Sequence, residues 1–390
     1  MKLAFLRITR RRVSQLVALS VAVAVTASTA AVAGGVTSSQ HAQKADAFSL
    51  APFIAKVKAY QKPSTKWQGP TTPVTPPTTK FKVVGISCYS ILHGCITPLV
   101  GAQHAAQALG WSMTILDGKG DPTVWAKDMD QAINSGANVI ILGAVDGDLI
   151  KPQLAKAKAK GIIVVSTSNA SAPGEQGFVL DTMVNMVTVG KMLADWMIVQ
   201  TGGKGPILPY WDKEYESNNI LMSGMLSELK LCTTCKIYTP VSFVGTQVGT
   251  TLAPNVVARL RSHSDVKYIS FTYDPALESV APAIANAGMK NVHAVSELGD
   301  AVNLGFIASG KVQDADGAWD NEYEGWATID QVLRIAAHQP LATTAGPARF
   351  KYGENIPYVL LTKRNLPPAG KDYVSSIPYV QEYKKLWGLA

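Results

Sequence analysis

Short hydrophobic runs alternate with helix-like segments between residues 81 and 182. Each run ends in small polar or acidic residues, as buried strands of a parallel sheet do; the runs are Val83–Ser87, Ser112–Asp117, Asn138–Asp146 and Ile162–Asn169. The segments between them repeat apolar residues at helical spacing, at Leu99–Leu109, Val124–Ile133 and Leu149–Ala159. This alternation predicts a doubly wound α/β layer, with a fifth strand at Gly177–Asp181.

The same rhythm returns after a helix expected at Asn185–Gln200 and a break at Gly202-Gly-Lys-Gly-Pro. Further strands are expected at Pro206–Tyr210, Lys236–Val241, Val266–Tyr273, Val292–Ser296, Lys311–Trp319 and Tyr358–Thr362. Helices are expected at Ser217–Leu231, Leu252–Ser262, Pro275–Ala287, Ala301–Ser309, Asn321–His338 and Tyr379–Trp387. Two similar α/β lobes in one chain predict a ligand cleft between them.

Polar side chains stand where the strands of the first series end. In parallel sheets ligands bind at the carboxyl ends of the strands. The first candidates are therefore Ser87-Cys88-Tyr89, Asp117, Asp146 and Ser168-Asn169. The alternative for Asp117, Asp121 and Asp146 is that each caps the helix that follows it.

The N-terminus has the pattern of an export signal. Basic residues 7–12 precede an apolar run from Leu16 to about Val25, and Ala31-Val32-Ala33 fits a cleavage site after Ala33. An uncleaved membrane anchor is the alternative, although the run is short and rich in Ala, Ser and Thr. The chain is therefore expected in the periplasm or at the outer face of the cell membrane, by the general or the twin-arginine route.

Residues 34–80 read as a leader to the folded body. A short helix is expected near Phe48–Tyr60, followed by a Pro/Thr-rich stretch from Pro63 to Thr79 that must be extended and irregular. The leader can act as a spacer from the cell surface or can pack along the body.

The charge of the chain does not favour nucleic acid as a partner. The formal net charge is +8, but five positive charges lie in residues 2–12, so the rest of the chain carries +3. No basic stripe interleaved with aromatic residues occurs.

Four cysteines in an exported chain predict two disulfides. Cys88 and Cys95 flank a short loop, and Cys232 and Cys235 form Cys-Thr-Thr-Cys. A redox-active pair is the alternative for the second motif, but it follows a helix-like segment rather than a strand. A zinc site is disfavoured, because no second Cys or His pair has matching spacing.

Three stretches resemble the type I periplasmic solute-binding proteins of sugar-type ABC importers, such as the ribose- and galactose-binding proteins. They are Gly101-Ala-Gln-His-Ala-Ala-Gln-Ala-Leu-Gly-Trp with Thr114-Ile-Leu-Asp, Asp130-Gln-Ala-Ile-Asn-Ser-Gly-Ala-Asn-Val-Ile-Ile-Leu, and Ala157-Lys-Ala-Lys-Gly-Ile-Ile-Val-Val. Tyr273-Asp-Pro-Ala stands where the family usually has Asn-Asp-x-x-Ala. The resemblance covers about residues 80–365.

The resemblance implies two lobes joined by three crossovers that form a hinge. The N-terminal lobe would comprise residues 80–181 and 299–340, and the C-terminal lobe residues 182–298 and 341–390. Ligand would bind between the lobes, and hinge closure would bury it. The closed monomer would then dock on a membrane permease.

The resemblance also implies site positions, residue by residue. The ligand-binding candidates are Tyr89, Ser90, Asp146, Ser168, Asn169, Asn219, Tyr273, Asp274, Glu297, Trp319 and Asp320, with Asp300 as an alternative to Glu297. Ser168-Asn169 and Asn219 stand where pentose and hexose binders often carry an arginine, which is the usual reader of planar anions. A site of aromatic faces, amides and one or two acids suits a neutral or cationic, sugar-like ligand.

Two other classes of function, a transcriptional regulator and an enzyme, are disfavoured by the sequence. A lactose-repressor-like regulator shares the fold but needs an N-terminal helix-turn-helix, and this chain has an export signal instead. No nucleophile elbow, metal-ligand helix or phosphate loop occurs, so we expect no catalysis, cofactor or metal. A cell-surface sensor that uses the same cleft to signal is the alternative to an importer subunit.

Overall fold

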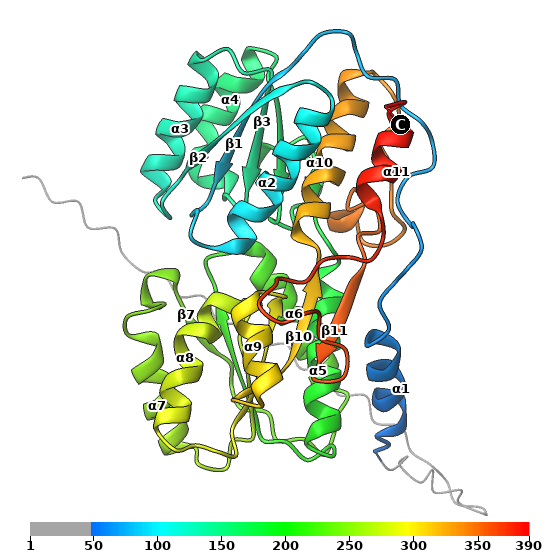
Figure 1. Cartoon of the computed structure of the whole chain (residues 1–390). Coiled ribbons are helices and arrows are strands. Elements are labelled where there is room, and N and C mark those ends of the chain that lie inside the picture. The colour runs from blue at the N-terminus through cyan, green and yellow to red at the C-terminus, as the bar shows by residue number, and fades with distance from the viewer. Residues whose placement is uncertain (1–47, 390) are drawn as a thin grey trace, which may run out of the picture. The chain divides into compact units, whose positions relative to one another are not determined.

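The computed structural model describes residues 48–389 and contains two β-sheets with helices packed on both faces (Figure 1). The predicted fold class, two doubly wound α/β lobes, is confirmed. The expected signal peptide at residues 1–33 and the start of the leader, residues 34–47, lie outside the described residues. No helix within residues 48–389 is both long and apolar enough to cross a bilayer.

The first sheet has the strand order β2-β1-β3-β4-β5, and all its pairs are parallel. Every residue of the central strand, Val-Ile-Ile-Leu-Gly, is buried, which explains its uninterrupted apolar sequence. The strands are β1 (Lys82–Ser87), β2 (Ser112–Asp117), β3 (Val139–Gly143), β4 (Ile163–Thr167) and β5 (Asp181–Thr182). The helical elements of this part of the chain are α2 (His93–Ala108), α3 (Pro122–Asn134), η1 (Gly147–Ile150), α4 (Lys151–Ala159) and η2 (Glu175–Gly177).

The second sheet has the order β11-β10-β9-β8-β6-β7, and only the edge strand β11 runs antiparallel. Its strands are β6 (Ile207–Asp212), β7 (Val241–Phe243), β8 (Tyr268–Ser270), β9 (His293–Leu298), β10 (Gln313–Trp319) and β11 (Tyr358–Thr362). Helix α1 (Ala51–Tyr60) lies in the leader. The helical elements that follow β5 are α5 (Met186–Gln200), α6 (Glu216–Leu229), η3 (Gly245–Gln247), α7 (Leu252–Ser262), α8 (Asp274–Asn286), α9 (Ala301–Ser309), α10 (Asn321–Ala336), η4 (Ala348–Phe350) and α11 (Tyr379–Leu386). The strand expected at Lys236–Val241 begins only at Val241, with one isolated bridge at Ile237.

The chain returns to the first lobe later than the resemblance implied. We expected residues 299–340 in the N-terminal lobe, but β10 pairs in parallel with β9, so α9 and β10 belong to the second sheet. The chain passes from the second lobe to the first after Trp319, and not at residue 299 as expected, so the unit of α9 and β10 stays in the second lobe. Helix α10 then packs closely on α2 of the first lobe: a Cβ on Gly325 would lie 2.0 Å from the Pro98 carbonyl oxygen. Glycine at this contact lets the two helix backbones approach.

The C-terminal tail is also divided between the lobes. We expected residues 341–390 in the C-terminal lobe, and β11 does pair with β10 of the second sheet. Helix α11, however, packs on α10 (Figure 1). Trp387, the residue directly after α11, stacks on Trp326 of α10 with ring centroids 5.5 Å apart and donates a 2.7 Å hydrogen bond to Asp330. Burial of these aromatic faces explains why the tail turns back to α10.

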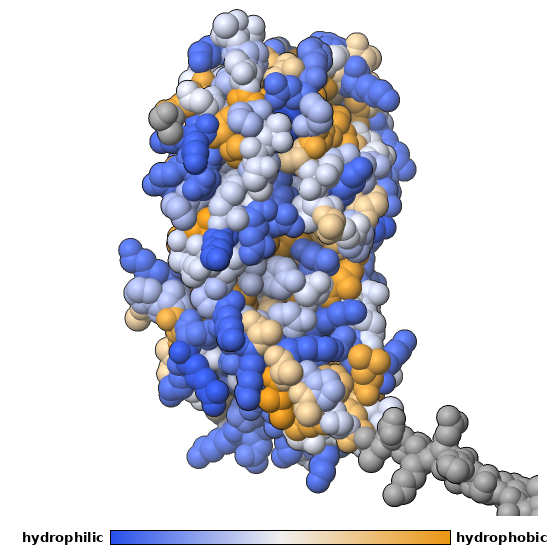
Figure 2. Space-filling view, turned by 90° about the vertical axis from the view of Figure 1, so that its right-hand side faces the viewer, coloured by the Kyte–Doolittle hydropathy of each residue, from blue (hydrophilic) through white to orange (hydrophobic). Residues whose placement is uncertain are grey.

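The described part of the leader packs along the body. Helix α1 lies against α5, and Lys56 forms an ion pair with the buried Glu228 of α6. Trp67 stacks on Tyr323 of α10 with ring centroids 5.9 Å apart. The Val74 amide donates a 2.9 Å hydrogen bond to the Leu386 carbonyl. On the face that carries the leader, hydrophobic residues appear as small separate patches (Figure 2). The spacer alternative therefore does not apply to residues 48–80.

Candidate functional site

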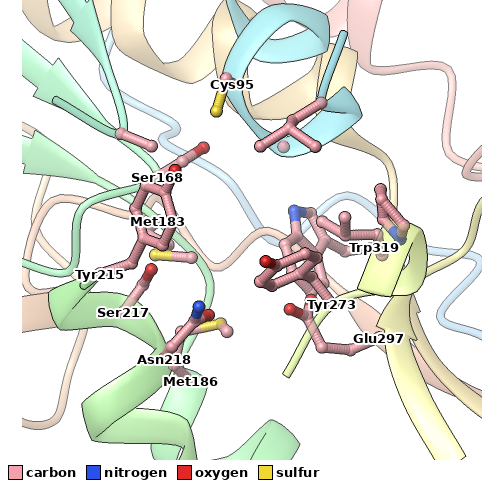
Figure 3. A pocket seen from close by; sticks show the side chains of 15 residues that line it. Cys95, Ser168, Met183, Met186, Tyr215, Ser217, Asn218, Tyr273, Glu297 and Trp319 are labelled. Atoms are coloured by element: carbon pink, nitrogen blue, oxygen red, sulfur yellow. The ribbon is translucent and has the colours of Figure 1, made fainter. Parts of the chain in front are cut away.

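A pocket lies between the carboxyl ends of the two sheets, with about 500 Å³ of empty space that includes its opening to solvent (Figure 3). Both lobes and the segments that join them contribute to it. The lining residues are Leu92, Gly94, Cys95, Ala144, Ser168, Met183, Met186, Tyr215, Ser217, Asn218, Tyr273, Pro275, Glu297, Leu298 and Trp319. The two lobes approach each other here, since a Cβ on Gly94 of α2 would lie 3.4 Å from Leu298 Cδ2.

Three lining residues have an unusual backbone conformation. Ala144, Ser168 and Leu298 directly follow or end strands β3, β4 and β9, and their φ angles are +54°, +61° and +130°. Side chains disfavour this region, and such residues cluster at functional sites. These three positive φ angles therefore support the assignment of this pocket as the functional site.

The wall formed by the second lobe carries most of the polar groups. Tyr215, Ser217 and Asn218 lie just before α6 or in its first turn, and Tyr273 precedes α8. The Tyr273 hydroxyl donates a 2.8 Å hydrogen bond to Asp212 Oδ2. The tyrosine ring therefore faces the pocket while its hydroxyl is already bonded to the protein.

The side of the pocket nearest the lobe connections is formed by Met183, Met186 and Trp319. Trp319 ends β10 and donates from Nε1 to Glu324 Oε2 over 3.1 Å. Glu324 Oε1 also accepts hydrogen bonds from Ser168 Oγ at 2.6 Å and Thr167 Oγ1 at 2.7 Å. Burial raises the pKa of Glu324 to about 7, although these three hydrogen bonds oppose the rise.

Glu297 is the one acid that lines the pocket among the described residues. Its side chain is 2% exposed, and Oε2 has no hydrogen-bond partner in the described part of the chain. Burial raises the pKa of Glu297 well above its usual value, and the nearby charges of Asp316, Asp300 and Glu324 raise it further. A raised pKa favours the protonated form of this carboxyl group, which has one O–H to donate.

Two groups of charged residues connect the lobes outside the pocket. His93 at the start of α2 forms a 2.9 Å hydrogen bond with Asp300, the residue before α9. This bond raises the pKa of His93 to about 9, against the opposing effect of burial. Arg349 of η4, between α10 and β11, lies 2.8 Å from Glu175 of η2 and 3.3 Å from Glu216 of α6.

His93, Asp300 and Asp372 also form a group that sequence spacing did not indicate. One ligand atom of each lies within 4.8 Å of the others, a separation that a metal ion could bridge. His93 Nδ1 is already bonded to Asp300 and lies 3.9 Å from Asp372 Oδ2, and we assign no metal to the group.

Four of the predicted ligand-binding residues line the pocket: Ser168, Tyr273, Glu297 and Trp319. Asp146 and Asn169 line a neighbouring depression instead. Asp146 caps η1 by accepting from the Asp148 amide at 2.9 Å, as the capping alternative predicts.

The other predicted residues lie outside the pocket lining, in three kinds of setting. Tyr89 and Ser90 sit in the loop after β1, where the Ser90 amide donates to Asp117. Asn219 is exposed and accepts from Trp211 Nε1 at 3.2 Å. Asp274 and Asp320 are buried and hold backbone amides, those of Asp300 and Ser375.

Most of the apolar lining of the pocket is not predicted by the sequence pattern. Met186 begins α5 and Met183 lies three residues before this helix, and no signal in the sequence separates a core position from a pocket position there. Ser217 and Asn218 directly precede the predicted Asn219, so moving the predicted position back by one residue gives Asn218, which lines the pocket. Leu92 lies two residues beyond the predicted Ser90.

The four cysteines are paired as expected. Cys88 pairs with Cys95 and Cys232 with Cys235, with Cα–Cα distances of 5.4 and 5.3 Å. No free cysteine occurs in residues 48–389. Cys95 lines the pocket, so the first pair supports its wall.

Comparison with known proteins gives a consistent result. The family model described as "Periplasmic binding protein domain" matches residues 84–340. No curated protein matches the chain in sequence. Similar solved structures share its fold at low sequence identity. One is an ABC transporter solute-binding protein from Agrobacterium vitis bound with α-D-tagatopyranose, with TM-score 0.66, 17% identity, and 78% of this chain and 99% of that chain covered.

Two further solved structures extend this comparison. An ABC transporter solute-binding protein from Agrobacterium vitis with bound allitol has TM-score 0.63 and 18% identity, and the match covers 74% of this chain and 98% of that chain. A solute-binding protein from Mycobacterium smegmatis with bound glycerol has TM-score 0.64 and 19% identity, and the match covers 76% of this chain and all of that chain.

Proposed function

Because the chain belongs to the periplasmic binding protein family, we propose that it is the extracytoplasmic solute-binding subunit of an ABC importer. It captures a small, uncharged, sugar-like molecule between its lobes and delivers it to a membrane permease. It acts as a monomer and as a binding protein, without catalysis. Its export follows from the signal pattern in residues 1–33.

One observation carries this proposal: both lobes line the pocket of Figure 3, and aromatic side chains form part of its lining. Tyr215, Tyr273 and Trp319 offer ring faces, and Ser217 and Asn218 offer hydrogen-bonding groups. Aromatic faces suit the apolar faces of sugar-like rings, and amides and hydroxyls suit ligand oxygens. A ligand that contacts both lobes favours their approach, because the separated lobes cannot make both sets of contacts.

The chemistry of the pocket supports an uncharged ligand. None of its lining residues among those described is Arg, Lys or Asp. A charged group buried without a partner is very unfavourable. The related structures also support this proposal, since their bound molecules are tagatose, allitol and glycerol, all of them uncharged.

A thermal-shift screen tests the proposal. Sugars, polyols, nucleosides and amines are added to the mature protein, and binding to the folded state raises the melting temperature, by an amount that grows with concentration above Kd. We expect stabilisation by uncharged ring compounds and none by amines. Absence of any stabilising solute in a broad screen would contradict a solute-binding role.

An importer subunit and a sensor subunit would bind different membrane proteins. The importer requires the ligand-loaded protein to bind a permease with an associated ATPase. A sensor subunit would instead bind a signalling membrane protein. Purification of the membrane complex that retains the tagged, ligand-loaded protein distinguishes the two.

A further inference from the structure

The pocket is unusually apolar for a site that would bind a fully hydroxylated sugar. Hydrocarbon is supplied by Leu92, Met183, Met186 and Leu298, with Ala144, Gly94, Pro275 and the Cys95 side chain completing the lining. Each hydroxyl of a buried polyol needs a partner, and each one left unpaired costs about 1–3 kcal/mol. The lining offers too few polar groups to pair a hydroxyl at every ring carbon.

Several donor hydrogens near the pocket are already used in bonds within the protein. Trp319 Nε1 and Ser168 Oγ both donate to Glu324, and the Tyr273 hydroxyl donates to Asp212. These three side chains therefore present mainly carbon to the cavity. The polar side chains of the lining that make no hydrogen bond to the described residues are Ser217, Asn218, Glu297 and Tyr215.

The remaining polar groups lie in one part of the pocket. Figure 3 shows Ser217 and Asn218 on the wall opposite Glu297, in the lower half of the view, and Cys95 at the upper end. Glu297 is 2% exposed, and its Oε2 lacks a partner among the described residues. A buried, unpartnered carboxyl beside a cavity marks the place where a ligand oxygen would be bound.

We propose that the pocket binds an uncharged ring compound of monosaccharide size whose oxygen atoms lie along one edge, such as a cyclic diol or hydroxyketone, in preference to a fully hydroxylated sugar or polyol. The inference rests on the proposed function, because it names the ligand class of the same cleft. The oxygen-bearing edge faces Glu297, Ser217 and Asn218. The hydrocarbon edge packs on Leu92, Cys95 and the neighbouring apolar residues at the other end of the pocket.

Titration calorimetry with matched probes tests this preference on the mature chain. cis-1,2-Cyclohexanediol and myo-inositol share a six-carbon ring but carry two and six hydroxyls. D-Fucose and D-galactose differ by one hydroxyl. We expect the diol to bind at least tenfold more tightly than myo-inositol, and D-fucose more tightly than D-galactose.

The outcomes separate this inference from the proposed function. Equal or tighter binding of myo-inositol or D-galactose overturns the ligand class but leaves a solute-binding role intact. Failure of the diol and of D-fucose to bind, while another solute stabilises the protein, also overturns the ligand class. Only the absence of any stabilising solute would overturn the proposed function itself.

Variants of Glu297 distinguish a neutral carboxyl from a carboxylate that binds a cation. Glu297→Gln keeps a donor and an acceptor, so binding of the diol should change less than threefold, whereas Glu297→Leu should weaken it more than tenfold. Glu382→Gln on α11, outside the pocket lining, is the matched control. Loss of binding in Glu297→Gln, with an unchanged melting temperature, would contradict an uncharged ligand.

Leu92→Asn tests the hydrocarbon edge. This change keeps the branched outline of the side chain and adds polar atoms to the apolar end of the pocket. The ratio of diol to myo-inositol affinity should fall at least fivefold, and a ratio is insensitive to a general loss of folded protein. An unchanged ratio would contradict the assigned orientation.

Discussion

Trp319 Nε1 donates a 3.1 Å hydrogen bond to Glu324 Oε2 at the point where the chain passes from β10 of the second sheet to α10. The other oxygen of the same carboxylate accepts from Ser168, which follows β4 of the first sheet, at 2.6 Å. Two pocket residues from different sheets are thus held by one buried acid. The indole nitrogen is turned toward this acid, and the ring is left as an apolar wall of the pocket.

Trp319→Ala should weaken ligand binding by about 1–3 kcal/mol, because removal of a central aromatic wall has costs of this size. Trp319 is 1% exposed, so truncation also lowers the free energy of unfolding, by about 3–5 kcal/mol for a buried tryptophan. Trp319→Phe retains most of the packing and serves as the second variant. Calorimetry gives the affinity, and small-angle scattering gives the compaction on ligand addition.

Trp111→Phe, a buried tryptophan change outside the pocket lining, is the control for packing effects. Wild-type affinity and compaction in Trp319→Ala would contradict the placement of this residue in the site. If Trp319→Ala is unfolded and Trp319→Phe binds like wild type, Trp319 has only a core role.

The sequence predicted the sheets better than it predicted the site, for a physical reason. Strands such as β3 are buried on both faces, so their apolar runs are visible without any knowledge of neighbours. The pocket depends instead on which strand ends meet and on residue-level register. Asn219 was predicted, yet Ser217 and Asn218 line the pocket while Asn219 faces solvent.

The lobe boundaries show a second limit of sequence pattern. A helix–strand unit such as α9 and β10 has the same periodicity in either lobe, so periodicity does not assign it to a sheet. The parallel pairing of β10 with β9 assigns this unit to the second sheet. The apolar lining was missed because residues such as Met183 and Met186 have the same pattern whether they face a core or a cavity.

Stability should fall as pH rises from about 5 to 8. Burial raises the pKa of Asp181 to about 8 and that of Glu324 to about 7, from ordinary values of 3.8 and 4.5. At a pH between the ordinary and the raised pKa of each acid, the folded protein keeps a proton on that acid that the unfolded chain has released. The free energy of unfolding therefore decreases with rising pH, by up to about 1.4 kcal/mol for each unit of pKa difference.

Melting temperatures at pH 5, 6.5 and 8, at constant ionic strength, measure this effect. Asp181→Asn cannot ionise, so its melting temperature should depend less on pH. A wild-type melting temperature that stays constant or increases from pH 5 to 8 would show that these acids are ionised in the folded protein.

Thiol titration of the denatured, unreduced protein should detect no free thiol, since Cys88–Cys95 and Cys232–Cys235 account for all four cysteines. Closing such short loops stabilises a protein by roughly 2–3 kcal/mol at most. Because Cys95 lines the pocket, a Cys88→Ala/Cys95→Ala variant should lose ligand affinity. The Cys232→Ala/Cys235→Ala variant should retain it. Detection of four thiols would refute both pairings.

Trp67→Ala should destabilise the protein even though the residue lies in the Pro/Thr-rich leader. Its ring stacks on Tyr323 and meets Tyr383 edge-on, with centroids 5.9 and 5.0 Å apart. Loss of a packed tryptophan and of its aromatic contacts should lower the free energy of unfolding by about 2–4 kcal/mol. Denaturant unfolding measures the change, and Lys66→Ala, on the adjacent exposed side chain, is the control. Equal stability of wild type and Trp67→Ala would mean that the leader is not bound to the body in solution.

The bond between His93 and Asp300 should make the approach of the two lobes depend on pH. Asp300 is the main cause of the rise in the pKa of His93 to about 9, and Asp372 and Glu278 add to it. If separation of the lobes returns His93 to its ordinary pKa of 6.5, the contact is fully present below pH 6.5 and is lost as pH rises through about 9. Ligand affinity should therefore decrease between pH 7 and 9.5, because binding requires both lobes to contact the ligand. His93→Gln keeps a neutral hydrogen-bonding group, so its affinity should vary less over this range. Calorimetry at pH 7, 8 and 9.5 compares the two proteins, and parallel pH profiles would show that this contact does not contribute to closure.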